Sequence, residues 1–92
     1  MSKKALRLHP DDNCVVSLTD IRQGDQVSYE GGMLVANADI DIGHKISIGS
    51  IQVGEKVRNY GAIIGSATSA INPGDHIHTH NLTSDYIVGF HH

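Results

Sequence analysis

The sequence predicts a mostly β domain built from short strands, and three observations lead to this class. No window of the chain combines a helical period of apolar residues with helix caps. Ten glycines are spread along the 92 residues, and short β-branched runs alternate with turn residues. A chain of this length suffices for one domain but not for two. We therefore expect a single domain over residues 1–92, with an aliphatic core because the chain has three Tyr, one Phe and no Trp.

The first half of the chain predicts a strand followed by a hairpin. Residues 14–18 form a short apolar run, which is typical of a buried strand. Residues 27–29 and 33–35 flank Glu30-Gly31-Gly32 as the two strands of a hairpin would. Cys14 is the only cysteine of the chain. It therefore has no partner for an internal disulfide, and its apolar neighbours predict a buried, inert thiol.

The second half predicts one helical turn and further strands. We expect a single helical turn over residues 39–43. Residues 45–48 alternate between polar and apolar, which is typical of a half-buried strand. Another strand is expected over residues 62–67, entered from the turn residues Tyr60-Gly61. Residues 76–80 alternate in the same way and predict a strand that follows a glycine turn.

A short turn pattern of the form Ile-x-x-Gly-x-x-Val/Ile recurs along the chain. The glycine of each copy supplies the positive φ that a chain reversal needs, and the β-branched residue three positions later begins the next buried face. The spacing of the copies is uneven, so the pattern does not indicate a solenoid. The four copies cover Ile21–Val27, Ile40–Ile46, Ile51–Val57 and Ile71–Ile77, with glycines at positions 24, 43, 54 and 74.

Composition and charge exclude several kinds of partner. The formal net charge is −3 with acids and bases interspersed, so no basic stripe is present to bind nucleic acid or an anionic membrane surface. No apolar run approaches the length of a membrane span, and no apolar segment follows the N-terminal lysines as in a signal peptide. With one unpaired cysteine, these features predict a protein of the reducing cytoplasm. His91 and His92 at the C-terminus are given no role.

The most informative segment is Gly74–Asn81, where three imidazoles stand at every second position. On a strand, His76, His78 and His80 would point to one face. Neighbours on such a face lie about 7 Å apart and the outer pair roughly 13 Å apart, so at most two of them can be direct ligands of one ion. Such a row can bind a transition metal, donate hydrogen bonds to an anionic substrate, or be the solvated face of an edge strand.

Two further groups are candidates. His44 lies beside a tight turn and could supply the ligand that a straight row lacks, and Lys45 could pair with a substrate carboxylate; the alternative is an ordinary solvent-facing turn. Tyr60 precedes a glycine in an otherwise apolar segment, and it is either a polar contact or a packed residue with its hydroxyl at the surface. Asn81 could orient an imidazole, bind a hydroxyl or simply form a turn.

Four motifs in order resemble the N-terminal domain of the altronate and galactarate dehydratase family. The resemblance covers about residues 5–83 and leaves residues 84–92 as a C-terminal tail. Its specificity comes from the order and spacing of separate motifs rather than from any one of them. The motifs are Asp41-Ile42-Gly43-His44-Lys45-Ile46, Ile51-x-x-Gly54-x-x-Val57, Tyr60-Gly61-x-x-Ile64-Gly65-x-Ala67, and Ile71-x-x-Gly74-Asp75-His76-Ile77-His78-Thr79-His80-Asn81-Leu82.

This resemblance implies a fold and an activity. The family's N-terminal module is the SAF type, a β-clip of short strands. It precedes a much larger catalytic region, or forms a separate small subunit as in the sulfolactate sulfo-lyases. The implied reaction abstracts the proton α to a carboxylate of a hydroxy acid and removes water, or sulfite in the sulfo-lyase branch, from the β position. The family enzymes depend on a divalent metal, Fe²⁺ or Mn²⁺.

By resemblance, the chain is expected to be the small subunit or N-terminal domain of a hydro-lyase for a sugar acid. It would act with a large dehydratase partner and be inactive alone. The alternatives are the small subunit of a sulfolactate sulfo-lyase, or a β-clip module that binds a sugar acid or a protein without catalysis. The expected metal would be held by this domain or mainly by the partner. Its expected ligands here are His44, His76, His78 and His80, and the expected substrate contacts are Lys45, Tyr60 and Asn81.

Overall fold

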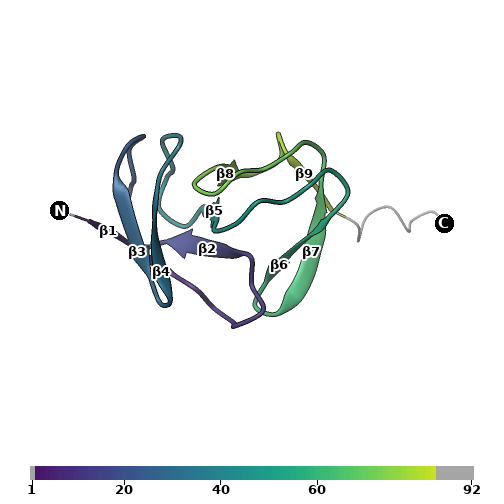
Figure 1. Cartoon of the computed structure of the whole chain (residues 1–92), viewed down its shortest axis with the longest axis horizontal. Coiled ribbons are helices and arrows are strands. Elements are labelled where there is room, and N and C mark those ends of the chain that lie inside the picture. Colours follow the sequence, from purple (N-terminus) through teal and green to yellow (C-terminus); the bar gives the residue numbers. More distant parts are fainter. Residues whose placement is uncertain (1, 85–92) are drawn as a thin grey trace.

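The structure, a computed structural model, describes residues 2–84 and consists there of nine strands without a helix (Figure 1). The mostly β class is therefore confirmed, and the short strands curl as in an SAF-type β-clip. No helix long and apolar enough to cross a membrane occurs among these residues. The strands are β1 Lys3–Leu6, β2 Cys14–Ser17, β3 Gln26–Tyr29, β4 Gly32–Val35, β5 Lys45–Ser47, β6 Lys56–Asn59, β7 Ala62–Ala67, β8 His76–Ile77 and β9 Leu82–Thr83.

The nine strands form two separate sheets. The larger sheet has the order β4-β3-β1-β2-β5-β8 and the smaller one the order β6-β7-β9. The pairing is antiparallel throughout these ladders except between β1 and β3. The ladders place the ends of the β3–β4 and β6–β7 hairpins along the lower side of the molecule, and β8 along the upper side (Figure 1).

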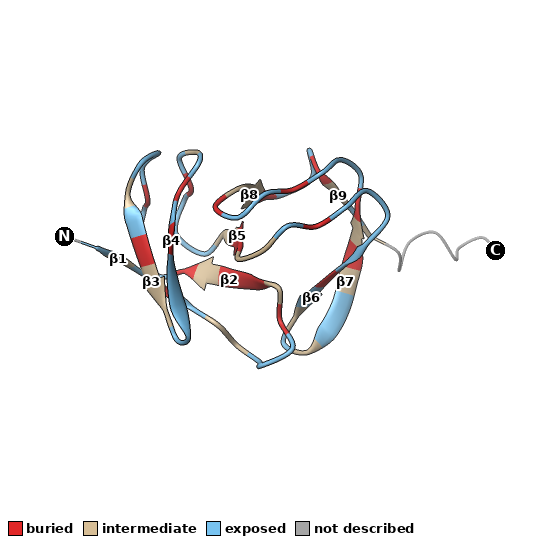
Figure 2. Ribbon diagram, viewed as in Figure 1, coloured by how far each residue is buried: buried red, intermediate tan, exposed pale blue. Residues whose placement is uncertain are grey.

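The core divides into two aliphatic clusters, and β2 lies between them. Val15 and Ile46 belong to one cluster, while Cys14 and Ile77 belong to the other. Because successive residues of a strand point to opposite faces, neighbouring residues of β2 serve different clusters. Figure 2 shows the buried residues gathered on the central strands and the exposed ones at the hairpin ends. The predicted aliphatic core is confirmed.

The repeated turn pattern forms the same structure in all of its four copies, which we call the Ile-Gly turns (residues 21–25, 40–44, 51–55 and 71–75). Each glycine has φ between 86° and 92°. The residue after the glycine donates its N–H to the carbonyl of the residue after the isoleucine, over 2.9–3.0 Å. This bond and the positive φ at the third turn position are those of a type II turn. The isoleucines pair across the fold, Ile21 with Ile40 and Ile51 with Ile71.

Three of the Ile-Gly turns carry an acid directly after the glycine, and its carboxylate closes the turn. Asp25 accepts the N–H of Arg22 at 2.9 Å, and Asp75 accepts that of Asn72 at 2.8 Å. Glu55 accepts a backbone N–H in the same way. The turn at residues 40–44 departs from this rule, because the residue after its glycine is His44.

The two halves of the chain repeat one order of elements: an Ile-Gly turn, a hairpin, a second Ile-Gly turn and a short strand. The hairpins are β3–β4, closed by Glu30-Gly31, and β6–β7, closed by Tyr60-Gly61. The second half is one residue longer within its hairpin, since Val57 pairs with Gly65 while the next residue pairs with Ile63. The extra residue, Ile64, packs against the second core cluster.

The predicted hairpin over residues 27–35 and the predicted strand over residues 62–67 are confirmed. The helical turn predicted over residues 39–43 is wrong. Ile40 forms an isolated β-bridge, and the segment after it is an Ile-Gly turn. Since Gly43 has φ of 86°, the chain reverses there and cannot continue a right-handed helix. The predicted tail at residues 84–92, with His91 and His92, lies outside the described residues after Ser84.

Cys14 is fully buried, as predicted, and its thiol donates to the carbonyl of Arg58 over 3.2 Å. Burial, followed by the nearby charge of Asp12, raises the pKa of the Cys14 thiol to about 12. The thiolate is the reactive form of cysteine. The fold therefore keeps this thiol protonated and inert.

We expect native Cys14 to react with a thiol reagent such as DTNB at pH 8 at least about 10³-fold more slowly than in the urea-unfolded chain, because reaction waits for unfolding. An added cysteine at an exposed position, Ser50→Cys, serves as the control and should react at once. The raised pKa also stabilises the fold below the unfolded value of 9.0, and this contribution is lost as the pH rises towards 12. Equal rates for Cys14 and the added cysteine would contradict burial of the thiol.

Candidate functional site

Four histidines meet where β5 pairs with β8. His44 ends the second Ile-Gly turn just before β5, and His76 begins β8. The register pairs Ile46 with His76. Because alternate residues of an extended chain share a face, His44 lies on the same face as Ile46 and thus beside His76. The sequence separates these two histidines by 32 positions, and the ladder between β5 and β8 brings them together.

The four imidazoles form a stack. The ring centroids of His44 lie 5.1 Å from those of both His76 and His78, and the His76 and His78 centroids are 5.4 Å apart. The ring of His80 is tilted and lies 5.6 Å from that of His76. His44 Nδ1 and His76 Nε2 form a hydrogen bond of 2.9 Å, in which one ring carries the shared proton. The four residues are called the histidine cluster below.

The predicted straight row over residues 76–80 is wrong, although its three histidines do come together. β8 ends at Ile77, and the chain then turns through residues 78–81. The turn brings the ring of His80 close to that of His76, whereas a strand would hold these residues roughly 13 Å apart. The prediction failed because alternation in sequence does not show where a strand ends.

Asn81 closes this turn. Its side chain is buried, its Nδ2 donates to the carbonyl of His76 at 2.8 Å, and its Oδ1 accepts the N–H of His78 at 2.9 Å. Its own N–H donates to the carbonyl of His78 at 3.0 Å. The amide therefore fixes the backbone on which the histidines stand. Thr79 adds a contact of 3.2 Å between its hydroxyl and Nδ1 of His78.

The cluster favours a neutral imidazole at its centre. The pKa of His76 is lowered, first by its partial burial and then by repulsion from His44, His78 and His80. His44 and His76 are partly buried, while His78 and His80 are exposed. The cluster thus combines a neutral, partly buried imidazole with two accessible ones. Such a group can accept a proton, pass it to a neighbour and donate hydrogen bonds to an oxygen-rich ligand.

The described residues form no complete metal site in this arrangement. Imidazole is a suitable donor for divalent transition metals. His44 and His76 turn facing nitrogens toward each other in a hydrogen bond of 2.9 Å. Among residues 2–84, no three His, Cys, Asp or Glu side chains are placed to hold a metal ion together.

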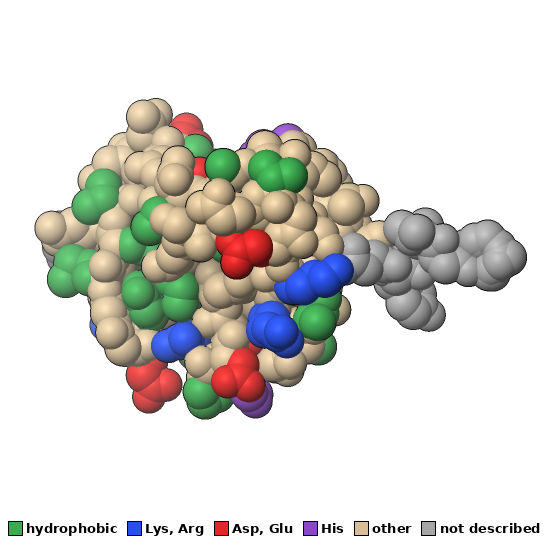
Figure 3. Space-filling view, turned by 45° about the vertical axis from the view of Figure 1, so that its right-hand side comes forward, with side chains coloured by type: hydrophobic (Ala, Val, Ile, Leu, Met, Phe, Trp, Pro, Cys, Tyr) green, Lys and Arg blue, Asp and Glu red, His purple; other side chains and the backbone are tan. Residues whose placement is uncertain are grey.

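Two other candidate residues lie away from the cluster. Lys45 pairs with Val16 and Ile77, so its side chain is on the face of β5 opposite to the cluster. Tyr60 is at the tip of the β6–β7 hairpin, on the lower side of the molecule, whereas β8 is on the upper side (Figure 1). The histidine side chains visible in Figure 3 likewise lie at two opposite edges.

Sequence reasoning missed Asp12, which is almost fully buried. Its carboxylate accepts the N–H groups of Tyr60 at 3.0 Å and of Gly61 at 2.7 Å. The guanidinium of Arg7 in turn donates to the carbonyls of Pro10 and Asp12. An Asp before a strand is ordinary in a turn, so the sequence alone gave no signal for this contact across 48 positions.

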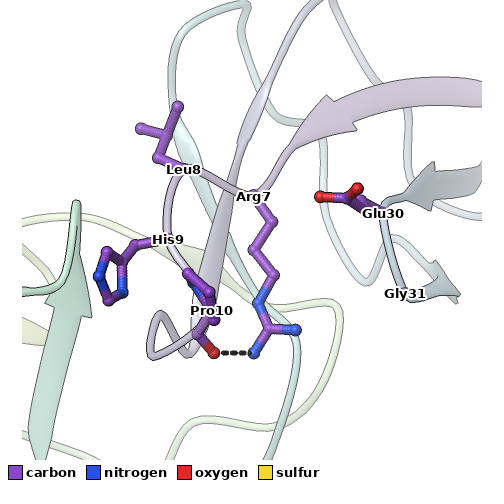
Figure 4. A pocket seen from close by; sticks show the side chains of 6 residues that line it. All are labelled: Arg7, Leu8, His9, Pro10, Glu30 and Gly31. Atoms are coloured by element: carbon purple, nitrogen blue, oxygen red, sulfur yellow. Dashed lines mark hydrogen bonds between the residues drawn. The ribbon is translucent and has the colours of Figure 1, made fainter.

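Two surface hollows lie beside the β3–β4 hairpin, away from the histidine cluster. One, of about 290 Å³, lies between the β1–β2 connection and the hairpin turn (Figure 4). The other, of about 310 Å³, lies beside β1 and β3. The histidine cluster lines neither of them. The first hollow is lined by Arg7, Leu8, His9, Pro10, Glu30 and Gly31.

Comparison with known proteins gives consistent matches. The sequence profile described as "Altronate/galactarate dehydratase SAF domain" matches residues 3–85. Altronate dehydratase of Bacillus subtilis is 37% identical over 83 residues, 90% of this chain and 17% of that protein. Altronate dehydratase of Escherichia coli is 36% identical over 80 residues, 87% of this chain and 16% of that protein.

A shorter relative is similar over part of the chain. The "(2R)-sulfolactate sulfo-lyase subunit alpha" of Paracoccus pantotrophus is 42% identical over 48 residues, which make up 52% of this chain and 72% of that subunit. The chain therefore spans only 16–17% of the length of the two altronate dehydratases that it matches, but most of the length of this sulfo-lyase subunit.

We expect stability to fall on acidification through the titration of His76. Its pKa is lowered in the folded chain, so the unfolded chain binds the proton more tightly. The contribution of neutral His76 is complete above the unfolded value of about 6.5 and is lost as the pH falls through the folded value. His76→Gln should show a weaker loss of unfolding free energy between about pH 7 and pH 5. Urea unfolding of both chains at pH 8, where His76 is neutral, measures the effect of lost packing alone. Equal slopes of unfolding free energy against pH for the wild type and His76→Gln would contradict the prediction.

Asp12→Asn should destabilise the fold by about 2 kcal/mol, because an amide replaces a carboxylate that accepts two backbone N–H groups in a buried place. The change leaves one of these donors facing an NH₂ group. Asp11→Asn alters an exposed neighbour and is the matched control, with an expected change within about 0.5 kcal/mol. Urea denaturation of both variants measures the difference, and similar midpoints for the two would show that the buried contact is unimportant.

Proposed function

Since this chain belongs to the family of altronate/galactarate dehydratase SAF domains, we propose that it is the small component of a hydro-lyase acting on a sugar acid. In this proposal it works beside a large dehydratase polypeptide in the cytoplasm and has no activity alone. The larger part supplies the catalytic pocket. The chain spans 16–17% of the altronate dehydratases that it matches, which supports a larger catalytic part outside these residues.

One observation carries the proposal: a cluster of four imidazoles, two of which are exposed. Enzyme sites normally enclose most of a small substrate, yet neither surface hollow is lined by the histidine cluster. The cluster combines a hydrogen-bonded pair of imidazoles, His44 and His76, with two exposed ones, so it has polar groups suited to a site but lacks enclosing walls. A partner surface laid over β5 and β8 would provide these walls and exclude water.

The cluster is suited to two tasks in such a site. His76 has a lowered pKa, which keeps its imidazole neutral and able to accept a proton, and it hydrogen-bonds to His44. His78 and His80 are exposed and can donate hydrogen bonds to the hydroxyl or carboxylate oxygens of a sugar acid. In the proposed reaction a base removes the proton from the α carbon, and the C–O bond at the β carbon breaks. The hydroxyl group takes up a proton and departs as water.

We assign the divalent metal of the proposal, Fe²⁺ or Mn²⁺, mainly to the large partner, because residues 2–84 contain no group of three His, Cys, Asp or Glu side chains placed to hold a metal ion. Such a metal stabilises charge that develops on the substrate's oxygens. The proposal does not use Lys45, which lies on the other face of β5, or Asn81, whose amide is committed to the turn. Tyr60 lies at the opposite side of the molecule (Figure 1).

A second candidate is elimination of sulfite from sulfolactate. It is favoured by the relative named as a sulfo-lyase subunit alpha, 72% of whose length is matched. A separate subunit of comparable size is the form that the first proposal also needs. The two candidates share proton abstraction next to a carboxylate and differ in the leaving group, so product analysis separates them.

The proposal is tested by assaying the purified chain with and without the large dehydratase polypeptide, using altronate, galactarate and sulfolactate. We expect no turnover by the chain alone and formation of a 2-oxo acid when both are present. His44→Gln with His76→Gln should lower the rate by at least about a hundredfold, and His9→Gln, outside the cluster, should not. Turnover by the chain alone would refute the proposal. Release of sulfite would select the second candidate, and binding of a sugar acid without turnover would indicate a noncatalytic module.

A further inference from the structure

Tyr60 is held in an unfavourable conformation and points into solvent. It has φ of 59° and is the one non-glycine residue with positive φ in the described part of the chain. Its side chain is 71% exposed. A bulky residue rarely adopts this backbone conformation, which costs on the order of 1 kcal/mol or more. Neither burial nor backbone preference explains a tyrosine at this position.

The equivalent hairpin shows that the fold does not need this strain. The β3–β4 hairpin is closed by Glu30-Gly31, and only its glycine has positive φ. The β6–β7 hairpin is closed by Tyr60-Gly61, and both residues have positive φ, as in a type I′ turn. Such turns favour Asn-Gly. A tyrosine therefore occupies a place where asparagine would suit the backbone better.

A buried charge holds this turn rigid. Both oxygens of the Asp12 carboxylate accept backbone N–H groups of the turn, at 3.0 Å from Tyr60 and 2.7 Å from Gly61. The ring of His9 covers the turn so closely that a Cβ at position 61 would lie 2.9 Å from it. A carboxylate is costly to bury unless it is fully hydrogen-bonded. The contacts of Asp12 thus fix the direction in which the tyrosine points.

The surroundings of Tyr60 are those of a contact surface. Ile63, on the same hairpin, is 47% exposed, and Figure 2 shows the lower part of β7 as exposed. Tyrosine is enriched in protein interfaces because its ring is large and loses little rotamer freedom. A backbone that is already held in place before binding also lowers the entropic cost of association.

We propose that Tyr60 anchors this domain to the large dehydratase polypeptide by inserting its ring into an apolar pocket of that partner. The inference rests on the proposed function. The partner is favoured over a second copy of this chain because the domain leaves more than four fifths of the length of the altronate dehydratases uncovered. Most of the surface beside which the domain works therefore belongs to that larger part. A partner of this size can contact the Tyr60 hairpin as well as the histidine cluster.

The test compares three chains by calorimetric titration into the large dehydratase polypeptide: wild type, Tyr60→Asn and Met33→Ser. Tyr60→Asn should weaken binding by at least about 30-fold, as expected for an aromatic anchor. Its melting temperature should stay equal or rise, because asparagine tolerates positive φ. Met33 is 59% exposed on the other hairpin, so Met33→Ser is the matched control and should bind like the wild type. Tyr60→Phe keeps the ring and should retain binding within about threefold, a loss below 1 kcal/mol.

The outcomes separate this inference from the proposed function. Tight wild-type binding that survives Tyr60→Asn would overturn the anchor alone. Weaker binding accompanied by a lower melting temperature would also overturn it, since the tyrosine would then be structural. Absence of wild-type binding would overturn both proposals. If light scattering showed that Tyr60→Asn instead abolishes self-association of the chain, a second copy would be the occupant and the proposed partner would be wrong.

Discussion

The fold depends on one local constraint, the glycine with positive φ in each Ile-Gly turn. The described chain has no helix, so its compactness depends on short strands that reverse at the right residues. Each reversal places an isoleucine opposite another, Ile21 with Ile40 and Ile51 with Ile71. Full burial of such a side chain contributes roughly 2 kcal/mol or more. A non-glycine residue would strain the turn and move the isoleucine. Packing of the core therefore depends on the backbone conformation of these turns.

The histidine cluster includes a residue from one of these turns, and that turn differs from the other three. Three Ile-Gly turns use an acid after the glycine to close the turn, with Asp25, Glu55 and Asp75 in that place. His44 takes the place of the acid in the remaining turn, which keeps its backbone hydrogen bond. The turn gives up one side-chain contact and gains an imidazole that faces His76. The same scaffold that forms the core therefore also delivers the first member of the site.

Much of this structure is local, and that part could be predicted from the sequence. The β3–β4 hairpin and the four turns depend on neighbouring residues, so glycine positions and alternation were enough to place them. The histidine row was misjudged because the strand ends at Ile77, and its end is set by the side chain of Asn81. The contact between Asp12 and the Tyr60 turn joins residues 48 positions apart. Such a contact depends on the assembled sheets, and no short pattern in the sequence indicates it.

At two positions the residue type differs from what the local turn structure favours, and packing of the core does not explain either residue. His44 stands where three equivalent turns have an acid, and Tyr60 stands where asparagine would suit a type I′ turn. A sequence that specifies one fold agrees with local preferences almost everywhere, and exceptions concentrate at functional or strained positions. Tyr60 strains its turn and is exposed, while His44 is partly buried and lacks the carboxylate contact of the other three turns. They lie at opposite sides of the molecule, so the proposed partner would have to extend over both, which requires a partner much larger than this domain.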